Sequence, residues 1–145
     1  MTTTTRNVLI AGAAVVALAG LLAYEIVATR PVREAVRAYS DLIAVANHPG
    51  MTDADRAAAA RPYFSSRRLA SGSIRFATEG GVEGLPRSIG RNFRAWREGG
   101  EVWLCPTGRT GVVHRLVEED GRWKLDGLVG YLRGTGELIP ATDGD

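Results

Sequence analysis

Residues 92–126 read NFRAWREGGEVWLCPTGRTGVVHRLVEEDGRWKLD, and this stretch decides the fold. Four short runs rich in Val, Leu and aromatic residues are separated there by glycine-containing turns. Such runs joined by short turns are typical of consecutive antiparallel strands. We therefore predict an antiparallel meander. It contains no recognisable catalytic motif, so function has to be inferred from what the two faces of the sheet present.

The lengths of the loops predict the register of the first three strands. If Gly99-Gly100 is a two-residue hairpin loop, Trp96 lies opposite Trp103. If the next loop has five residues, Leu104 lies opposite His114. Because side chains alternate between the faces of a strand, each of these pairs shares one face of the sheet.

The turn within residues 118–121 decides the face of the last strand. A loop of two or four residues places Leu116 and Trp123 on the same face. A three-residue bulged loop would instead put Arg115 on that face. Since burying an arginine costs more than burying a neutral histidine, we reject the bulged loop and place His114 on the buried face.

The meander is thereby divided into an inner and an outer face. The inner face, which helices should cover, is apolar apart from one histidine and holds Phe93, Ala95, Val102, Leu104, Val112, His114, Leu116, Trp123 and Leu125. The outer face is charged at its ends and apolar in the middle, and holds Arg94, Trp96, Glu98, Glu101, Trp103, Cys105, Val113, Arg115, Val117, Arg122 and Lys124.

Helices are predicted ahead of the meander. Pro31 suits a first helical turn, and a continuous apolar stripe follows it at helical spacing, formed by Val32, Ala35, Val36, Tyr39, Leu42, Ile43 and Ala46. Thr52 and Asp55 resemble a capping box, which predicts a second short helix. We further expect a helical turn over residues 63–70, a strand over 73–78, a loop over 79–90, and an extension of the last strand through 128–131.

An apolar stretch runs from Val8 to Val27 near the N-terminus, interrupted only by Glu25. About 20 helical residues span a bilayer core, so we predict a transmembrane helix over residues 8–28. The alternative is a secretory signal cleaved after Ala19, within the small-x-small sequence Ala17-Leu18-Ala19. The expected organisation is a tail (1–7), this helix, an α+β domain (31–133) and a C-terminal tail (134–145).

Two arguments about membrane orientation conflict. Arg30, Arg33 and Arg37 follow the span and only Arg6 precedes it, which by the positive-inside rule puts the domain in the cytoplasm. A single N-terminal anchor ahead of a globular domain more often exports that domain. We expect the second arrangement, a single-pass protein of the cell membrane with an extracytoplasmic domain.

Composition excludes several classes of partner. The net charge of the 145 residues is +2, which is too small to indicate a nucleic-acid partner. Because Arg30, Arg33 and Arg37 follow the predicted transmembrane helix, we expect them to contact anionic lipid instead. A single cysteine, Cys105, excludes an intrachain disulfide, and no carboxylate lies at ligand spacing from His48 or His114. We expect neither a metal nor a cofactor.

The closing hairpin VEEDGRWKLDGL (residues 117–128), after a long amphipathic helix and shorter helices, resembles the nuclear transport factor 2-like superfamily. The resemblance covers residues 31–133 and implies a cone-shaped domain whose curved sheet wraps the long helix. Its members include isomerases and dehydratases with an Asp–His pair or a Tyr–Asp site, ligand binders and membrane-anchored accessory domains. Here His114 and Tyr39 would point inward, but Asp126 falls on the outer face, so no catalytic set is matched and we expect no enzyme.

Two sets of site residues follow. Trp96 and Trp103, flanked by Arg94 and Arg115, predict an outer-face interface for a protein partner or a second copy. Alternatively, the C-terminal residues 138–140 fold back over the tryptophans. A second hypothesis is a small-ligand or isomerase-like pocket inside the cone, with His114 and Tyr39 as its polar groups.

Overall fold

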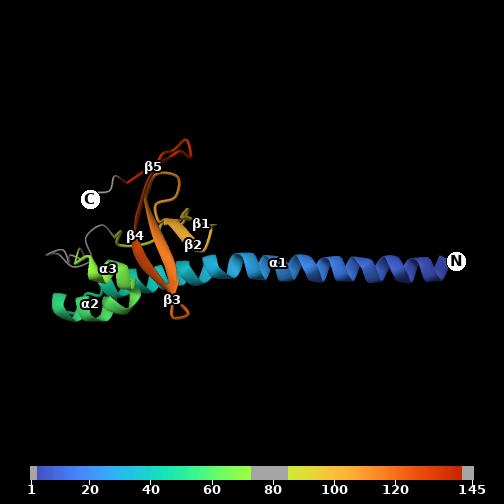
Figure 1. The fold of residues 1–145 in the computed structure, drawn as a ribbon, viewed down its shortest axis with the longest axis horizontal. Helices are drawn as coiled ribbons and strands as arrows, with labels where there is room; N and C mark the ends of the chain where they lie inside the picture. Colours follow the sequence, from blue (N-terminus) through green and yellow to red (C-terminus); the bar gives the residue numbers. More distant parts are fainter. Residues whose placement is uncertain (1–2, 73–84, 142–145) are drawn as a thin grey trace. The chain divides into compact units, whose positions relative to one another are not determined.

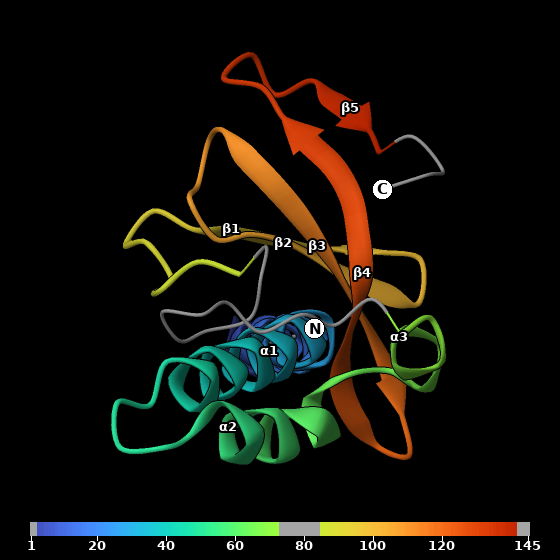
Figure 2. The same cartoon turned by 90° about the vertical axis from the view of Figure 1, so that its left-hand side faces the viewer.

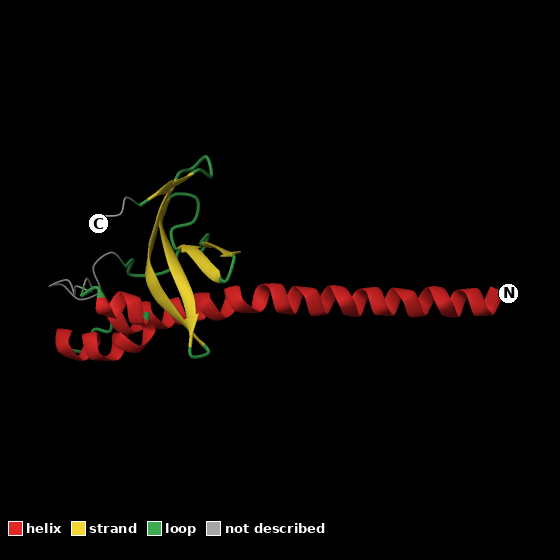
Figure 3. Ribbon diagram, in the orientation of Figure 1, coloured by secondary structure: helices red, strands yellow, loops and turns green. Residues whose placement is uncertain are grey.

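A computed structural model describes residues 3–72 and 85–141 (Figure 1). It is an α+β structure with a long N-terminal helix and a curled antiparallel sheet (Figure 3). The chain divides into two compact units, Met1–Pro31 and Val32–Asp145. The elements are α1 (Thr3–Ala46), α2 (Asp53–Ala60), a 3-10 turn η1 (Arg61–Tyr63), α3 (Ser66–Ala70), β1 (Arg94–Glu98), β2 (Glu101–Cys105), β3 (Gly111–Glu119), β4 (Arg122–Leu132) and β5 (Leu138–Pro140).

Helix α1 does not start at Pro31, as the sequence predicted, but runs through it. Proline removes one backbone donor and crowds the preceding turn, so it disturbs a helix locally. One turn earlier, the Thr29 hydroxyl donates a hydrogen bond of 2.6 Å to the Glu25 carbonyl. Good helix-forming residues on both sides of the proline allow the helix to continue across it.

The first unit presents apolar side chains to its surroundings. Val15, Val16, Leu18, Leu21 and Leu22 each expose more than half of their area. Among the described residues, α1 is the one helix long and apolar enough to cross a membrane, a property that a signal sequence near an N-terminus also has.

In the second unit the predicted apolar stripe is confirmed as the buried face of α1. Ala35, Tyr39, Leu42, Ile43 and Ala46 are at most 5% exposed. They form the main core with residues from β2, β3 and β4, including Val102, Leu104 and Leu116. The amphipathic helix therefore supplies one half of the core and the sheet the other.

The predicted start of α2 is also confirmed. The Thr52 hydroxyl accepts a hydrogen bond from the Asp55 backbone N–H (3.2 Å) and donates one to its carboxylate (2.7 Å). One of the backbone N–H groups that a helix N-terminus leaves unpaired is satisfied in this way. Ser65 caps α3 similarly, by accepting from the Arg68 N–H at 3.0 Å.

The sheet has the order β1-β2-β3-β4-β5, so the predicted meander is confirmed and gains a fifth strand. Trp96 pairs with Trp103 and Leu104 with His114, as the loop lengths predicted. The last hairpin turns at Asp120 (φ 54°) and Gly121 (φ 71°). Two positive φ angles suit the right-handed twist of a two-residue hairpin. This turn leaves Leu116 and Trp123 on one face.

Strand β4 carries irregularities that the sequence did not predict. Its register with β3 shifts between Val113 and His114 and again between Arg115 and Leu116. One extra residue of β4 is accommodated at each shift, Val129 and Asp126 respectively. Bulges of this kind bend a strand and increase its twist. The curl of the sheet follows from their position halfway along β4.

The C-terminal tail includes β5, which the sequence did not predict as a strand. Gly130 pairs with Pro140, Tyr131 with Ile139, and Leu132 with Leu138. A Cβ atom at Gly130 would overlap the Ile139 carbonyl oxygen, so glycine permits this close approach. The strand expected over residues 73–78 lies outside the described residues, and the described part of the expected loop, 85–90, is irregular.

Candidate functional site

The helices of the described residues cover one end of the inner sheet face and leave the other end uncovered. Figure 2 shows α2, α3 and the C-terminal turns of α1 at one end of the sheet, while the β4–β5 end stands apart from them. We use the name "covered end" for the buried inner residues, which are at most 8% exposed. They are Val102, Leu104, His114, Leu116, Trp123 and Leu125. We use the name "open end" for the inner residues Val112, Leu128, Tyr131 and Ile139, which are 37–48% exposed.

The open end is a continuous row across three strands. Val112 of β3 pairs with Tyr131 of β4, and Tyr131 pairs with Ile139 of β5. Residues directly opposite each other on neighbouring strands bring their side chains into contact. Leu128 pairs with His114, two residues along β3 from Val112, and so adjoins the row. The sequence placed Val112 on a face that helices should cover, and that expectation of burial was wrong.

At the covered end, His114 meets Tyr39 of α1, its predicted partner. The two rings lie 5.2 Å apart between centroids, and the residues are 1% and 2% exposed. Burial, and secondarily the positive charge of Arg68, lower the pKa of His114 to about 4. The imidazole is therefore neutral near pH 7 and belongs to the core.

Two buried polar atoms, one on Tyr39 itself and one on Arg68, are left without hydrogen-bond partners among the described residues. The Tyr39 hydroxyl and the Nε of Arg68 are buried and unpaired within the described part of the chain. A buried polar group without a partner usually costs stability, and such groups often mark a functional position or a bound water.

The predicted tryptophan pair forms on the outer face. Trp96 and Trp103 meet edge to face at 6.1 Å between centroids, and the Arg94 guanidinium lies 6.0 Å from the Trp96 ring. Both rings are half-buried and pack on an outer cluster formed by Cys105, Val113 and Leu132 with Val129 and Leu138. Leu138 of β5 also packs on this cluster, and residues 138–140 pair with β4. Cys105 is fully buried in this cluster.

Arg115, the other predicted interface residue, pairs with Asp126. Arg115 Nε lies 2.9 Å from Asp126 Oδ2, and Arg67 of α3 also binds this carboxylate. The Ser65 hydroxyl donates to Asp126 Oδ1 at 2.5 Å. Asp126 is 7% exposed, so its charge is compensated inside the protein. This ionic cluster ties α3 to the middle of β4 and was not predicted.

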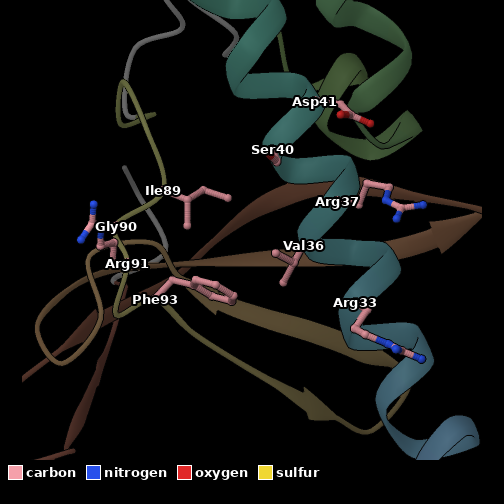
Figure 4. Close-up of a pocket in the computed structure, with 9 residues that line it drawn as sticks. All are labelled: Arg33, Val36, Arg37, Ser40, Asp41, Ile89, Gly90, Arg91 and Phe93. Carbon is pink, nitrogen blue, oxygen red and sulfur yellow. The ribbon is translucent and has the colours of Figure 1, made fainter.

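A groove separates α1 from the segment leading to β1 (Figure 4). We call it the α1 groove. Its volume is about 450 Å³, and its lining residues are Arg33, Val36, Arg37, Ser40, Asp41, Ile89, Gly90, Arg91 and Phe93. Neither Tyr39 nor His114 lines it. Phe93, predicted to be covered on the inner face, is 40% exposed at its edge.

The described residues were compared with the requirements of a metal site and of a general base. Among the described residues, no group of three or more His, Cys, Asp or Glu side chains could hold a metal ion. In the part of the chain that the structure describes, the ring contact of His114 is with Tyr39, and no carboxylate is paired with the imidazole to orient it as a general base. Comparison of the chain with protein-family models, curated proteins and solved structures gives no match.

Proposed function

We propose that the chain is a single-pass membrane protein whose α+β domain binds a protein partner or a second copy through the open end. The observation that carries this proposal is the row of exposed apolar side chains Val112, Tyr131 and Ile139. Together with Leu128, the row presents an area on the order of 300 Å², similar to the largest apolar patch of a typical monomer. A patch of this size is suited to the centre of an interface.

The proposed anchor is the apolar helix from Val8 to Val27, with the domain on the extracytoplasmic side of the cell membrane. The side chains of Val15 to Leu22 named above are exposed, as lipid-facing residues would be. The anchor is tested by alkaline extraction of membranes, after which we expect the chain to stay in the membrane fraction. N-terminal sequencing of the mature protein tests cleavage after Ala19. Protease treatment of intact cells tests on which side of the membrane the domain lies.

The open end is a better candidate surface than the tryptophan pair. Tyr131 is 48% exposed and pairs with Val112 of β3 on one side and with Ile139 of β5 on the other. Trp103 is half-buried and donates from its indole nitrogen to Glu101 at 3.0 Å. Its ring packs on the outer cluster, so part of its apolar area already stabilises the domain. The tryptophan face remains a second proposed surface, with Arg94 and Arg115 at its rim.

The test is the substitution Tyr131→Glu in the full chain. Its matched control is Thr135→Glu, which adds the same charge at an exposed turn position. We expect the wild type and the control to retain an oligomer or a co-purifying protein from native membranes. Tyr131→Glu should lose it by tenfold or more, because a charge would have to be desolvated in the interface. Equal retention by both variants would contradict the proposed surface.

A small-ligand site in the covered end is a second candidate function. The unpaired Tyr39 hydroxyl and Arg68 Nε, close to His114, favour a small anionic or hydrogen-bonding ligand there. Such a ligand would donate to or accept from the phenol and pair with the guanidinium. Tyr39→Phe removes only the hydroxyl, so it should weaken ligand binding without loss of stability. Unchanged small-molecule content in native mass spectra of the two proteins would exclude this function.

A further inference from the structure

We propose that the α1 groove binds the headgroup of an anionic phospholipid from the membrane in which the chain is anchored. This inference rests on the proposed membrane anchor but not on the open end as a protein interface. It concerns a different surface, since the groove shares no lining residue with the open end.

The centre of the groove is apolar. Val36 of α1 and Ile89 and Phe93 of the opposite segment lie between the helix and that segment in Figure 4. Phe93 keeps 40% of its area exposed there. A wholly polar anion such as phosphate would leave this floor unused. A glycerol backbone with the first methylenes of its acyl chains would bury it.

The rims of the groove are basic. The guanidinium ends of Arg33 and Arg37 lie on the side of α1 away from Ile89 and Phe93, and that of Arg91 points away from the helix (Figure 4). None of the ion pairs between described residues uses these three arginines, and Asp41 is the one acidic lining residue. Three arginines and one aspartate therefore give the lining residues a net charge of +2, although the guanidinium groups have to turn toward the groove to meet a bound anion. Arginine binds phosphate oxygens through paired N–H donors, and its long side chain can swing toward a bound headgroup.

The position of the groove in the sequence, just after the predicted transmembrane helix, indicates that the bound anion is a membrane lipid. Arg33 follows Val27, the end of the apolar stretch, by six residues of sequence. Basic residues this close to an anionic bilayer surface each strengthen binding by roughly fivefold. A volume of about 450 Å³ lies within the range of small-molecule sites but is too small for two full acyl chains. A headgroup whose acyl chains stay in the bilayer meets both conditions.

The experiment is native mass spectrometry of the full chain released from a non-ionic detergent. The probes are dioctanoyl phosphatidylglycerol, dioctanoyl phosphatidylcholine and inorganic phosphate. We expect the wild type to retain phosphatidylglycerol at least tenfold better than phosphatidylcholine, and to retain no phosphate. Equal retention of the two lipids, or retention of phosphate alone, would overturn the proposal.

Two variants separate the groove from general charge. Replacing Arg33, Arg37 and Arg91 by glutamine should reduce phosphatidylglycerol retention by tenfold or more. The matched control replaces Arg61, Arg109 and Arg122, which are exposed and lie outside the groove. If both triple variants lose the lipid equally, the binding is nonspecific and the groove is not its site.

A third comparison separates this inference from the proposed protein interface. Phe93→Gln removes part of the apolar floor without a change of charge, so it should weaken lipid retention and leave protein association intact. Leu128→Gln, at the open end, should have the opposite effects. Loss of lipid in Leu128→Gln but not in Phe93→Gln would overturn the groove assignment. Release of the wild type by alkaline extraction would contradict the anchor alone.

Discussion

The covered end and the open end of the inner sheet face have the same kind of sequence but different surroundings. Both contain apolar residues of β3 and β4, and both are formed by side chains paired across strands. At the covered end, α1 supplies Tyr39 and Leu42 to the core. At the open end, none of the described helices supplies a comparable residue. Alternation thus determines which face is apolar, and the reach of the helices determines how much of that face is buried.

The largest contrast is expected between two leucines. Leu116 is 1% exposed at the covered end and Leu128 is 44% exposed at the open end. Leu116→Ala should lower the free energy of unfolding by about 3 kcal/mol, because it leaves a cavity in the core. Leu128→Ala should cost no more than about 1 kcal/mol. Urea unfolding of the full chain in detergent measures both. Similar costs would show that the open end is buried in solution.

The next effect concerns protonation at the covered end. The pKa of His114 is lowered to about 4 from an ordinary value of 6.5, because burial and the charge of Arg68 oppose the imidazolium. The unfolded state therefore binds a proton more tightly than the folded state. Stability from this group is fully present above about pH 6.5 and is lost as the pH falls toward about 4, by up to about 3 kcal/mol.

His114→Phe tests this dependence, because phenylalanine can face Tyr39 but does not titrate. At pH 7 the variant should unfold at a urea concentration close to that of the wild type. At pH 4.5 it should be more stable than the wild type by about 2 kcal/mol. If the two proteins lose stability in parallel between pH 7 and pH 4.5, the imidazole is not buried as described.

A smaller effect is expected at the boundary between the two ends, where Asp126 occupies a bulge. Asp126→Asn removes the charge that Arg67 and Arg115 share, and should cost about 2 kcal/mol because both guanidinium groups lose a buried partner. Its control is Glu137→Gln, which breaks the exposed pair with Arg133 and should cost no more than about 0.5 kcal/mol. Thermal unfolding of the two variants compares them. Equal shifts would mean that the Asp126 cluster is solvated.

Local patterns in the sequence were sufficient for much of the fold. The hydrophobic stripe of α1, the Thr52 cap and the pairing of Trp96 with Trp103 each depend on residues close in sequence or on the length of one loop. Such features are determined by backbone geometry and can be worked out without knowledge of the rest of the molecule.

The features that were missed depend on contacts between distant residues. Asp126 was correctly placed away from the inner face, but its burial requires Ser65 and Arg67, about sixty residues earlier in the chain. The bulge that accommodates it has no local signal, because any residue of β4 could be the extra one. The open end was missed for a related reason. The alternation of apolar residues in β3 and β4 does not indicate how much of their inner face the helices cover.

The smallest effect is expected from changing a valine to threonine at the open end, a change that keeps shape and adds a hydroxyl. Val112→Thr should alter the free energy of unfolding by no more than about 0.5 kcal/mol, because water can reach the new group and threonine suits a strand. Val102→Thr, at a fully buried position, should cost about 2 kcal/mol, because its hydroxyl would be desolvated. Thermal unfolding of the isolated chain measures both. If Val112→Thr is neutral in isolation but weakens association in native membranes, the apolar character of the open end serves a partner and not the fold.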